Sequence, residues 1–359
     1  MKKRVFSIFL LLFLCLPLIF SCTGGDTKQT AAPSEPSADT AAASETEKTQ
    51  TGPAADTSAY ETLPEKPTEA TETPTTEAPE PNPYGIFTYD HNTVNVNVSS
   101  PYCILINAKT NEILFTNCDV NEKIYPASTT KLLTAIIALK YGDPAEVFTP
   151  GDELDLVASD SSKAYIKSHH KLTLEMLIEG MMLPSGGDAA YVVAAGVGRI
   201  IAGNDALTSV EAVAVFIDEM NKFAEEHGLA GSHFTCPDGY HDDDHYTTLL
   251  DIMTVSRLAL DEPIIMKYAG LYDDDVKYAS GHKITWTNTN LLLDKDSKYY
   301  YENAIGLKTG TTDEAGYCLV SAAALGSKKV LAGVFAAPNT GARFNDSRAL
   351  LVAGMVAAQ

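Results

Sequence analysis

A long tract without large apolar side chains limits where this chain can fold. From Thr23 to Pro83 the sequence consists mainly of Thr, Ala, Pro, Glu and Ser, with twelve acidic residues and three lysines. Such a segment buries too little apolar surface to offset the conformational entropy lost on ordering. We therefore expect residues 22–83 to form a disordered tether that spans roughly 40 Å as flexible coil. The folded domain is then expected over residues 84–359.

The N-terminus has the pattern of an export signal. Three basic residues at positions 2–4 precede an apolar run that extends to Phe20 and ends in "LIFSC". A basic start followed by a short apolar run is typical of a secretion signal, and "LIFSC" resembles the lipobox of bacterial lipoproteins. This resemblance implies that residues 1–21 are removed, that Cys22 is lipidated, and that the exported protein is anchored to the outer face of the cell membrane. An ordinary signal peptide with an incidental cysteine is the alternative.

The charge of the chain argues against one class of partner. The formal net charge is -21. Nucleic-acid binding requires a basic surface, so we expect no nucleic-acid partner.

Strand patterns occur at both ends of the remaining sequence. "YCILINA" and "EILFTN" predict two strands joined by a turn at 109–111, and "AGYCLVSAAAL" and "KKVLAGVFAA" predict two more near the C-terminus. Helical periodicity lies mainly between them, at 128–142, 173–183, 188–202, 210–227 and 247–261, and a last helix follows from Ala342. The expected fold class is α/β (α+β), with one sheet built from distant strands and a helical region inserted.

Two cysteines flank the first predicted hairpin. Cys103 and Cys118 could lie on one face of it, and disulfides are common in exported proteins. Both a disulfide and two free thiols remain open. No pair of cysteines has the spacing of zinc ligands.

Three Ser-x-x-Lys matches occur, and their surroundings differ. Ser128 and Lys131 follow Pro126 in "YPASTTKLLTA", where a helix is expected to begin at once. Residues three apart share a helix face, so Lys131 Nζ can reach Ser128 Oγ. The positive potential of a helix N-terminus favours an alkoxide and a neutral lysine, which can act as the base for a serine nucleophile. The other matches are expected in a polar loop and a glycine turn: Ser168/Lys171 and Ser280/Lys283.

Two later segments fit the same chemistry. "MMLPSGGDAA" places Ser185 in a loop between two expected helices, and "GLKTGTTDEAGYCLV" places Lys308 at the mouth of an expected strand. Ser-x-x-Lys, a second serine motif and Lys-Thr-Gly, in this order, resemble the signature of penicillin-interacting serine enzymes. The wording of "YPASTTKLLTA", "HFTCPDGYHDDDHYTTLLDI", "TNTNLLL" and "GLKTGTTDEAGYCLVSAA" narrows this resemblance to the low-molecular-weight D-alanyl-D-alanine carboxypeptidases, from about Tyr84 onward.

The resemblance implies a fold and an activity. The fold would be β-lactamase/transpeptidase-like, an antiparallel sheet flanked by helices. The activity would be removal of the terminal D-alanine from peptidoglycan stem pentapeptides, with β-lactams such as penicillin as inhibitors. It implies no cofactor and no metal ion.

The resemblance also implies roles for individual residues. Ser128 would be the acylated nucleophile, Lys131 its base, and Ser185 the group that passes a proton to the departing amine. The backbone N–H groups of Ser128 and Thr311 would form the oxyanion hole. Four residues would bind the substrate and its carboxylate: Lys308, Thr309, Gly310 and Arg343. For Arg343, an ordinary solvated cation is the alternative.

One position departs from the family pattern. The family has asparagine as the third residue of its second motif, and this chain has Gly187. The neighbouring Asp188 does not replace it, because the family usually has aspartate there as well. A lower rate, a substitute water or amide, or a drift toward binding without turnover all remain open. On the sequence alone, asparagine at 187 is expected to raise kcat/KM.

Other hypotheses also remain. "HDDDH" at 241–245 invites a metal site, but Gly239 and three aspartates argue for a loop. A β-lactamase would share the three motifs, but we find no Glu-x-x-Leu-Asn segment to activate a deacylating water. The third hypothesis is a lipid-anchored, wall-binding relative that does not turn its ligand over.

Overall fold

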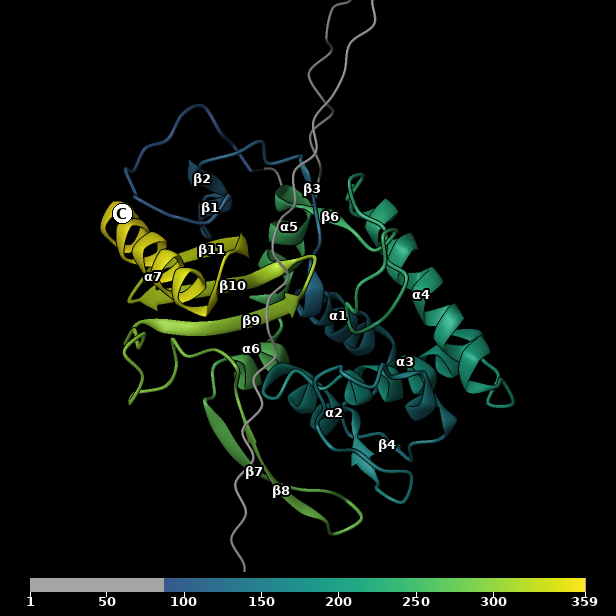
Figure 1. Cartoon of the computed structure of the whole chain (residues 1–359). Coiled ribbons are helices and arrows are strands. Elements are labelled where there is room, and N and C mark those ends of the chain that lie inside the picture. The colour runs from purple at the N-terminus through teal and green to yellow at the C-terminus, as the bar shows by residue number, and fades with distance from the viewer. Residues whose placement is uncertain (1–86, 359) are drawn as a thin grey trace, which may run out of the picture. The chain divides into compact units, whose positions relative to one another are not determined.

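A five-stranded antiparallel sheet crosses the domain (Figure 1). The computed structural model describes residues 87–358. The strand order is β2-β1-β11-β10-β9, and every pairing is antiparallel. The strands are β1 (Tyr102–Asn107), β2 (Glu112–Thr116), β9 (Ala304–Thr312), β10 (Gly316–Leu325) and β11 (Lys328–Ala337). The predicted class is confirmed, because strands from both ends of the domain form one sheet.

Both faces of this sheet are buried. Successive side chains of a strand point to opposite faces, and β1 shows the consequence: Cys103 and Leu105 pack in one apolar cluster, and Ile104 and Ile106 in the other. Helix α7 (Thr340–Ala357) covers the first face against β1, β10 and β11. Helices α5 (Leu249–Ala259) and α6 (Pro263–Ala269) contact strands from the other side.

A second layer of helices surrounds α1 (Lys131–Tyr141). Its residues 131–138 are all buried, as expected for a helix that is apolar on every side. It packs against α2 (Leu174–Met182), α3 (Gly187–Ala202), α4 (Ser209–Glu226), α5 and α6. The 3₁₀ turn η1 (Ala127–Thr130) leads directly into α1 and contacts β9 and β10. The start of α1 therefore lies where the sheet meets the helical region.

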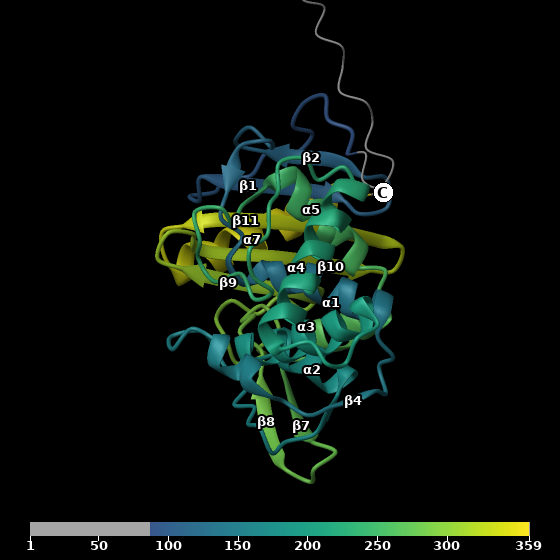
Figure 2. The ribbon, with the colours of Figure 1, turned by 90° about the vertical axis from the view of Figure 1, so that its right-hand side faces the viewer.

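Shorter elements complete the domain. The pairs are β3 (Lys123–Ile124) with β6 (Thr247–Thr248), β4 (Val147–Phe148) with β5 (Leu172–Thr173), and β7 (Asp273–Lys277) with β8 (Lys283–Thr287). A 3₁₀ turn, η2, spans Asp152–Leu156. The β7–β8 hairpin projects beyond the helices (Figure 2). None of the helices between residues 87 and 358 is long and apolar enough to cross a membrane.

The sequence-based prediction missed some elements. The helix expected from Thr247 begins at Leu249, because residues 247–248 pair with β3. Helix α6 and strands β7, β8 and β9 were not predicted. In the hairpin, "DDDVK" and "KITWT" each bury only one side chain fully, Val276 and Trp286, so no strong apolar alternation marks them.

The structure holds Cys103 and Cys118 as free thiols, along with the other two cysteines of the described region. Cys103 lies in the apolar cluster under α7, whereas Cys118 packs against the cluster on the opposite face. The structure has no bond between their sulfur atoms, so it does not support the disulfide hypothesis.

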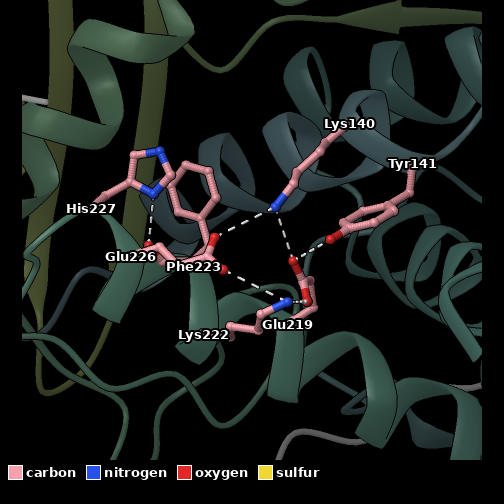
Figure 3. Close-up of polar contacts among 7 residues, drawn as sticks. All are labelled: Lys140, Tyr141, Glu219, Lys222, Phe223, Glu226 and His227. Atoms are coloured by element: carbon pink, nitrogen blue, oxygen red, sulfur yellow. Dashed lines mark hydrogen bonds and ion pairs between the residues drawn. The ribbon is translucent and has the colours of Figure 1, made fainter.

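A buried carboxylate fastens α4 to the end of α1 (Figure 3). Glu219 Oε1 accepts hydrogen bonds from Tyr141 Oη at 2.5 Å and Lys140 Nζ at 3.1 Å, and Oε2 lies 3.3 Å from Lys222 Nζ. Both lysines also lie 3.7 Å from Glu226. Burial opposes ionisation of Glu219, but the hydrogen bonds from Tyr141 and Lys140 outweigh it and lower its pKa.

We predict that Glu219→Gln lowers the free energy of unfolding at pH 7 by about 1–2 kcal/mol, since it replaces charge-assisted hydrogen bonds. A carboxyl whose pKa is lower in the folded state stabilises the fold above its unfolded pKa, about 4.3 for glutamate, and loses this effect as pH falls. The difference between variant and parent should therefore shrink in urea unfolding at pH 4.

Glu226→Gln is the matched control, because its side chain is 44% exposed and surface ion pairs contribute about 0–1 kcal/mol. Equal losses in the two variants, or a loss in Glu219→Gln that does not depend on pH, would contradict the assigned role of Glu219.

Candidate active site

The first predicted motif forms at the junction of sheet and helices. Ser128 lies in η1, and Lys131 is the first residue of α1. Lys131 Nζ is 2.9 Å from Ser128 Oγ. Ala127, just before the serine, has φ of +48°, a conformation that is uncommon outside glycine. This turn directs the serine hydroxyl toward the lysine.

Lys131 is completely buried. Its Nζ donates to the backbone carbonyl of Asp238 at 2.6 Å. Burial lowers the pKa of Lys131, and the negative charge of Asp238 partly opposes this effect. Because a buried ammonium is costly, the site favours the neutral amine that a general base requires.

The other two Ser-x-x-Lys matches lie on the surface, as predicted. Ser168 and Lys171 are exposed in a turn, and Ser280 and Lys283 are exposed at the tip of the β7–β8 hairpin. Ser280 Oγ accepts from the backbone N–H of Lys171. Neither of these serines contacts the lysine of its own match.

Ser185 and Lys308 form a second serine–lysine contact. Ser185 precedes α3, is 4% exposed and has φ of +61°. Lys308 Nζ donates to Ser185 Oγ at 2.8 Å and to the carbonyl of Thr309 at 3.0 Å. Burial, together with the charges of Lys131 and Arg343, lowers the pKa of Lys308 well below its usual value. The prediction that Lys308 lies at the mouth of a strand was wrong, since residues 308–310 lie inside β9.

Strand β9 is an edge of the sheet and packs directly on η1. A β-carbon at Gly310 would lie 3.0 Å from the backbone nitrogen of Ser128 and 3.0 Å from the carbonyl oxygen of Pro126. Glycine is required for this close approach. It brings the backbone of β9 at Thr311 beside Ser128, and the outer edge of β9 is not paired within the sheet.

Arg343 reaches the same strand from α7. Its Nη1 donates to Thr311 Oγ1 at 3.1 Å and to the carbonyl of Gly310 at 3.3 Å, and its Nε has no hydrogen-bond partner in the described region. The residue is 7% exposed, so it is not the solvated cation of the alternative interpretation. Thr309 Oγ1 is held by Thr289 Oγ1 at 2.5 Å.

A cavity of about 340 Å³ opens onto Ser128 and Thr311. The segments 160–162, 238–241 and 312–314 form its other walls. Sequence analysis missed the part played by Asp238, whose carbonyl holds Lys131, although "HFTCPDGYHDDDHYTTLLDI" was among the words that carried the resemblance. A backbone acceptor leaves no trace in residue type, so only the fold could reveal it.

The comparisons with known proteins agree with this geometry. A sequence model of the family described as D-alanyl-D-alanine carboxypeptidase, peptidase S11, matches residues 89–339.

The chain belongs to this family.

Several relatives in the S11 family are similar to the chain. D-alanyl-D-alanine carboxypeptidase DacF of Bacillus subtilis is 28% identical over 238 residues, covering 65% of this chain and 56% of the relative. The D-alanyl-D-alanine carboxypeptidase of Streptomyces sp. strain K15 is 34% identical over 233 residues, covering 62% and 76%. The crystal structure of the Streptomyces K15 DD-transpeptidase matches with a TM-score of 0.66 and 30% identity, covering 72% of this chain and 98% of that one. The chain thus spans a little over half the length of DacF.

The space beside Gly187, where the S11 pattern has an asparagine side chain, is filled by other side chains. A β-carbon there would lie 2.5 Å from Ser161 Oγ and 2.7 Å from Asp238 Oδ2. Asp188 is fully engaged elsewhere, because its carboxylate accepts from the backbone N–H groups of Ala164 and Ile166. Asparagine at 187 would therefore have to displace Ser161 Oγ and Asp238 Oδ2, and its expected effect on kcat/KM stays a prediction.

The two histidines of "HDDDH" lie in different environments. His245 is 2% exposed, and its Nδ1 accepts from the backbone N–H of Thr235 at 3.0 Å while Nε2 lies 2.9 Å from Thr130 Oγ1. Burial lowers the pKa of His245 to about 4. His241 lies at the cavity wall instead. Between residues 87 and 358, no group of three or more His, Cys, Asp or Glu side chains is arranged to hold a metal ion.

For this S11 site we predict that Lys131→Arg lowers the rate of acylation of Ser128 by a labelled penicillin by about 10²–10⁴-fold, the range typical of general-base catalysis. Arginine stays protonated in proteins, so it cannot take the proton from Ser128. Lys171→Arg, in the exposed match, is the control and should leave the rate unchanged. Substantial acylation of Lys131→Arg would show that Lys131 is not the base.

Proposed function

We propose that this chain is a serine D-alanyl-D-alanine carboxypeptidase that removes the terminal D-alanine from peptidoglycan stem pentapeptides. The observation that carries the proposal is the buried Ser128–Lys131 contact of 2.9 Å at the wall of an open cavity. Membership of the S11 family and the second contact, between Ser185 and Lys308, support it. β-Lactams such as penicillin would acylate the same serine.

In the proposed acylation, Ser128 Oγ attacks the carbonyl carbon between the last two D-alanines, and Lys131 Nζ accepts the hydroxyl proton. The carbonyl oxygen becomes an oxyanion, and the backbone N–H groups of Ser128 and Thr311 are the proposed donors to it. Removing one such donor typically costs about 3 kcal/mol of transition-state stabilisation. The close packing at Gly310 supports this placement, since it brings β9 against the Ser128 amide.

The carbonyl then re-forms as the bond to the leaving nitrogen breaks. Ser185 is the proposed donor of the proton to that nitrogen, and its contact with Lys308 Nζ gives it a source of protons. The substrate carboxylate would lie among the positive groups along β9, with Lys308, Thr309, Gly310 and Arg343 around it. Arg343 has an unpartnered buried Nε that favours an anionic ligand.

Release completes the proposed cycle. Before release, the proton that Lys131 took from Ser128 is passed on to replace the one that Ser185 gave to the leaving nitrogen. Water then attacks the ester carbonyl and loses a proton to the neutral Lys131, which returns it to Ser128 Oγ as the ester bond breaks and the shortened stem peptide leaves. An amine in place of water would give transpeptidation by the same steps.

We predict that penicillin forms a covalent adduct on Ser128, since a neutral lysine and an oxyanion hole suffice for acylation. Peptide mapping by mass spectrometry should place the added mass on the peptide that contains Ser128, and Ser128→Ala should carry none. Ser168→Ala and Ser280→Ala, in the two exposed matches, should label like the parent. An adduct on either of those serines would overturn the assignment.

Turnover separates the remaining hypotheses. Release of D-alanine from a stem pentapeptide is expected for a carboxypeptidase. Adduct formation without D-alanine release would favour a wall-binding relative, and rapid nitrocefin hydrolysis would favour a β-lactamase.

We further propose that the protein is a bacterial lipoprotein, exported and anchored through lipid on Cys22. Residues 1–21, Cys22 and the tether 22–83 lie outside the described residues, so the proposal rests on the basic start, the apolar run and "LIFSC". Lipid chains contribute about 0.8 kcal/mol per buried CH₂, so several chains on one cysteine would hold the protein firmly. A long tether would let the domain reach peptidoglycan away from the membrane.

We predict that Cys22→Ser shifts the protein from the membrane fraction to the soluble fraction, because the proposed lipid site is lost. Cys15→Ser, inside the apolar run, is the matched control and should remain with membranes. If Cys22→Ser fractionates with membranes as fully as the parent, the lipid proposal is wrong.

A further inference from the structure

Two side chains from separate loops meet beside Gly187. Ser161 Oγ donates to Asp238 Oδ2 at 3.0 Å. Both atoms lie within 3 Å of the place where a side chain at 187 would begin. Glycine at this position therefore makes room for the contact between Ser161 and Asp238.

The loop that carries Ser161 is docked on the start of α3. The backbone N–H of Gly187 donates to the carbonyl of Ser162 at 2.7 Å. A few residues further on, Ala164 and Ile166 donate to the Asp188 carboxylate at 2.7 and 2.9 Å. Ser161 is thereby held at the cavity by backbone contacts of the residues that follow it.

Asp238 connects this contact to the proposed base. The residue is 1% exposed. Its Oδ1 accepts from the backbone N–H of Tyr240 at 3.2 Å, while its own carbonyl accepts from Lys131 Nζ at 2.6 Å. A shift of the carboxylate would move the carbonyl of the same residue, and with it the lysine that lies 2.9 Å from Ser128.

We propose that the Asp238 carboxylate, held by Ser161, is a positioning residue for Lys131 and takes the place of the amide that this chain lacks at Gly187. The inference rests on the proposed function, in which Lys131 is the base. The Asp238 carboxylate differs from an amide in one respect: it places a negative charge beside the lysine.

That charge acts on the proton equilibrium of Lys131. Asp238 raises the pKa of Lys131 against the effect of burial. The other charged or titratable groups that face Lys131 are Cys236 in the same loop, Asp188 on α3 and Lys308 on β9. A neutral residue at 238 would remove one of the charges that raise the pKa of Lys131. Burial and the charge of Lys308 would then lower this pKa further, so Lys131 would lose its proton at lower pH.

The test compares full-length variants by the rate of Ser128 acylation with labelled penicillin between pH 5 and pH 10. In Asp238→Asn, which keeps the shape, the acid limb of the profile should move to lower pH by on the order of one unit. In Ser161→Ala the rate should fall by about tenfold, without the downward shift. Ser232→Ala is the matched control, because Ser232 Oγ donates to another buried carboxylate, Asp251, at 2.8 Å, and its profile should match the parent.

An unmoved acid limb in a folded Asp238→Asn variant would overturn the inference, because a merely structural role lowers the rate without moving the limb. Unchanged acylation in Ser161→Ala would overturn it as well, even if Asp238→Asn failed to fold. A parent that never acylates Ser128 would overturn the proposed function itself, which separates the two failures.

A double-variant comparison tests the shared space. Gly187→Ala places a methyl group against Ser161 Oγ and Asp238 Oδ2 and should lower acylation by about tenfold. In the Ser161→Ala background, Gly187→Ala should lower the acylation rate by a clearly smaller factor, because the Ser161 hydroxyl oxygen that obstructs the methyl group is gone. Effects that multiply independently would show that these residues do not occupy one space.

Discussion

The burial of Lys131 is the constraint on which the rest of the site depends. A lysine with no exposed surface cannot be solvated as an ammonium, so the protein must either pair it or keep it neutral. Here its nitrogen is held by a serine hydroxyl and a backbone carbonyl. Such a lysine is poorly suited to stabilising the fold but well suited to taking a proton from Ser128.

The architecture supplies that burial. Helix α1 is surrounded by five other helices, and its first residue lies where η1 meets β9. Lys308 from β9 contacts Ser185, and Arg343 from α7 contacts Thr311 at the cavity wall. Burial lowers the pKa of both basic residues. Three basic residues from distant parts of the chain thus lie close to one another at the site. Basic side chains and backbone N–H groups at such a place are a common way to bind a carboxylate and to stabilise an oxyanion.

The loops around the cavity determine what surrounds the changed motif. In this chain a glycine stands at the asparagine position of the second motif, and Ser161 and Asp238 fill the space from the side. The lysine retains a hydrogen-bond acceptor because that acceptor is a backbone carbonyl. Motif residues and loop residues therefore share one space, and a motif considered in isolation does not show what surrounds it.

Local sequence was sufficient for several features. Ser128 and Lys131 could be paired because helix geometry is short-range, and the apolar segments of β1, β10 and β11 predicted strands. Strand β9 escaped prediction because four of its five buried positions hold glycine, lysine or threonine, and only Leu307 is a large apolar residue. The β7–β8 hairpin escaped because most of its side chains are exposed.

The tertiary structure alone decided the contacts that join distant segments. Lys308 meets Ser185 and Asp238 meets Lys131 across more than a hundred residues. Whether Gly187 left a gap could not be known from its identity, because the neighbours that fill the space come from loops centred on 161 and 238. The pattern of side chains along a segment indicates its preferred secondary structure, because that preference depends on neighbours within a few residues. Which segments then face one another depends on the packing of the whole domain.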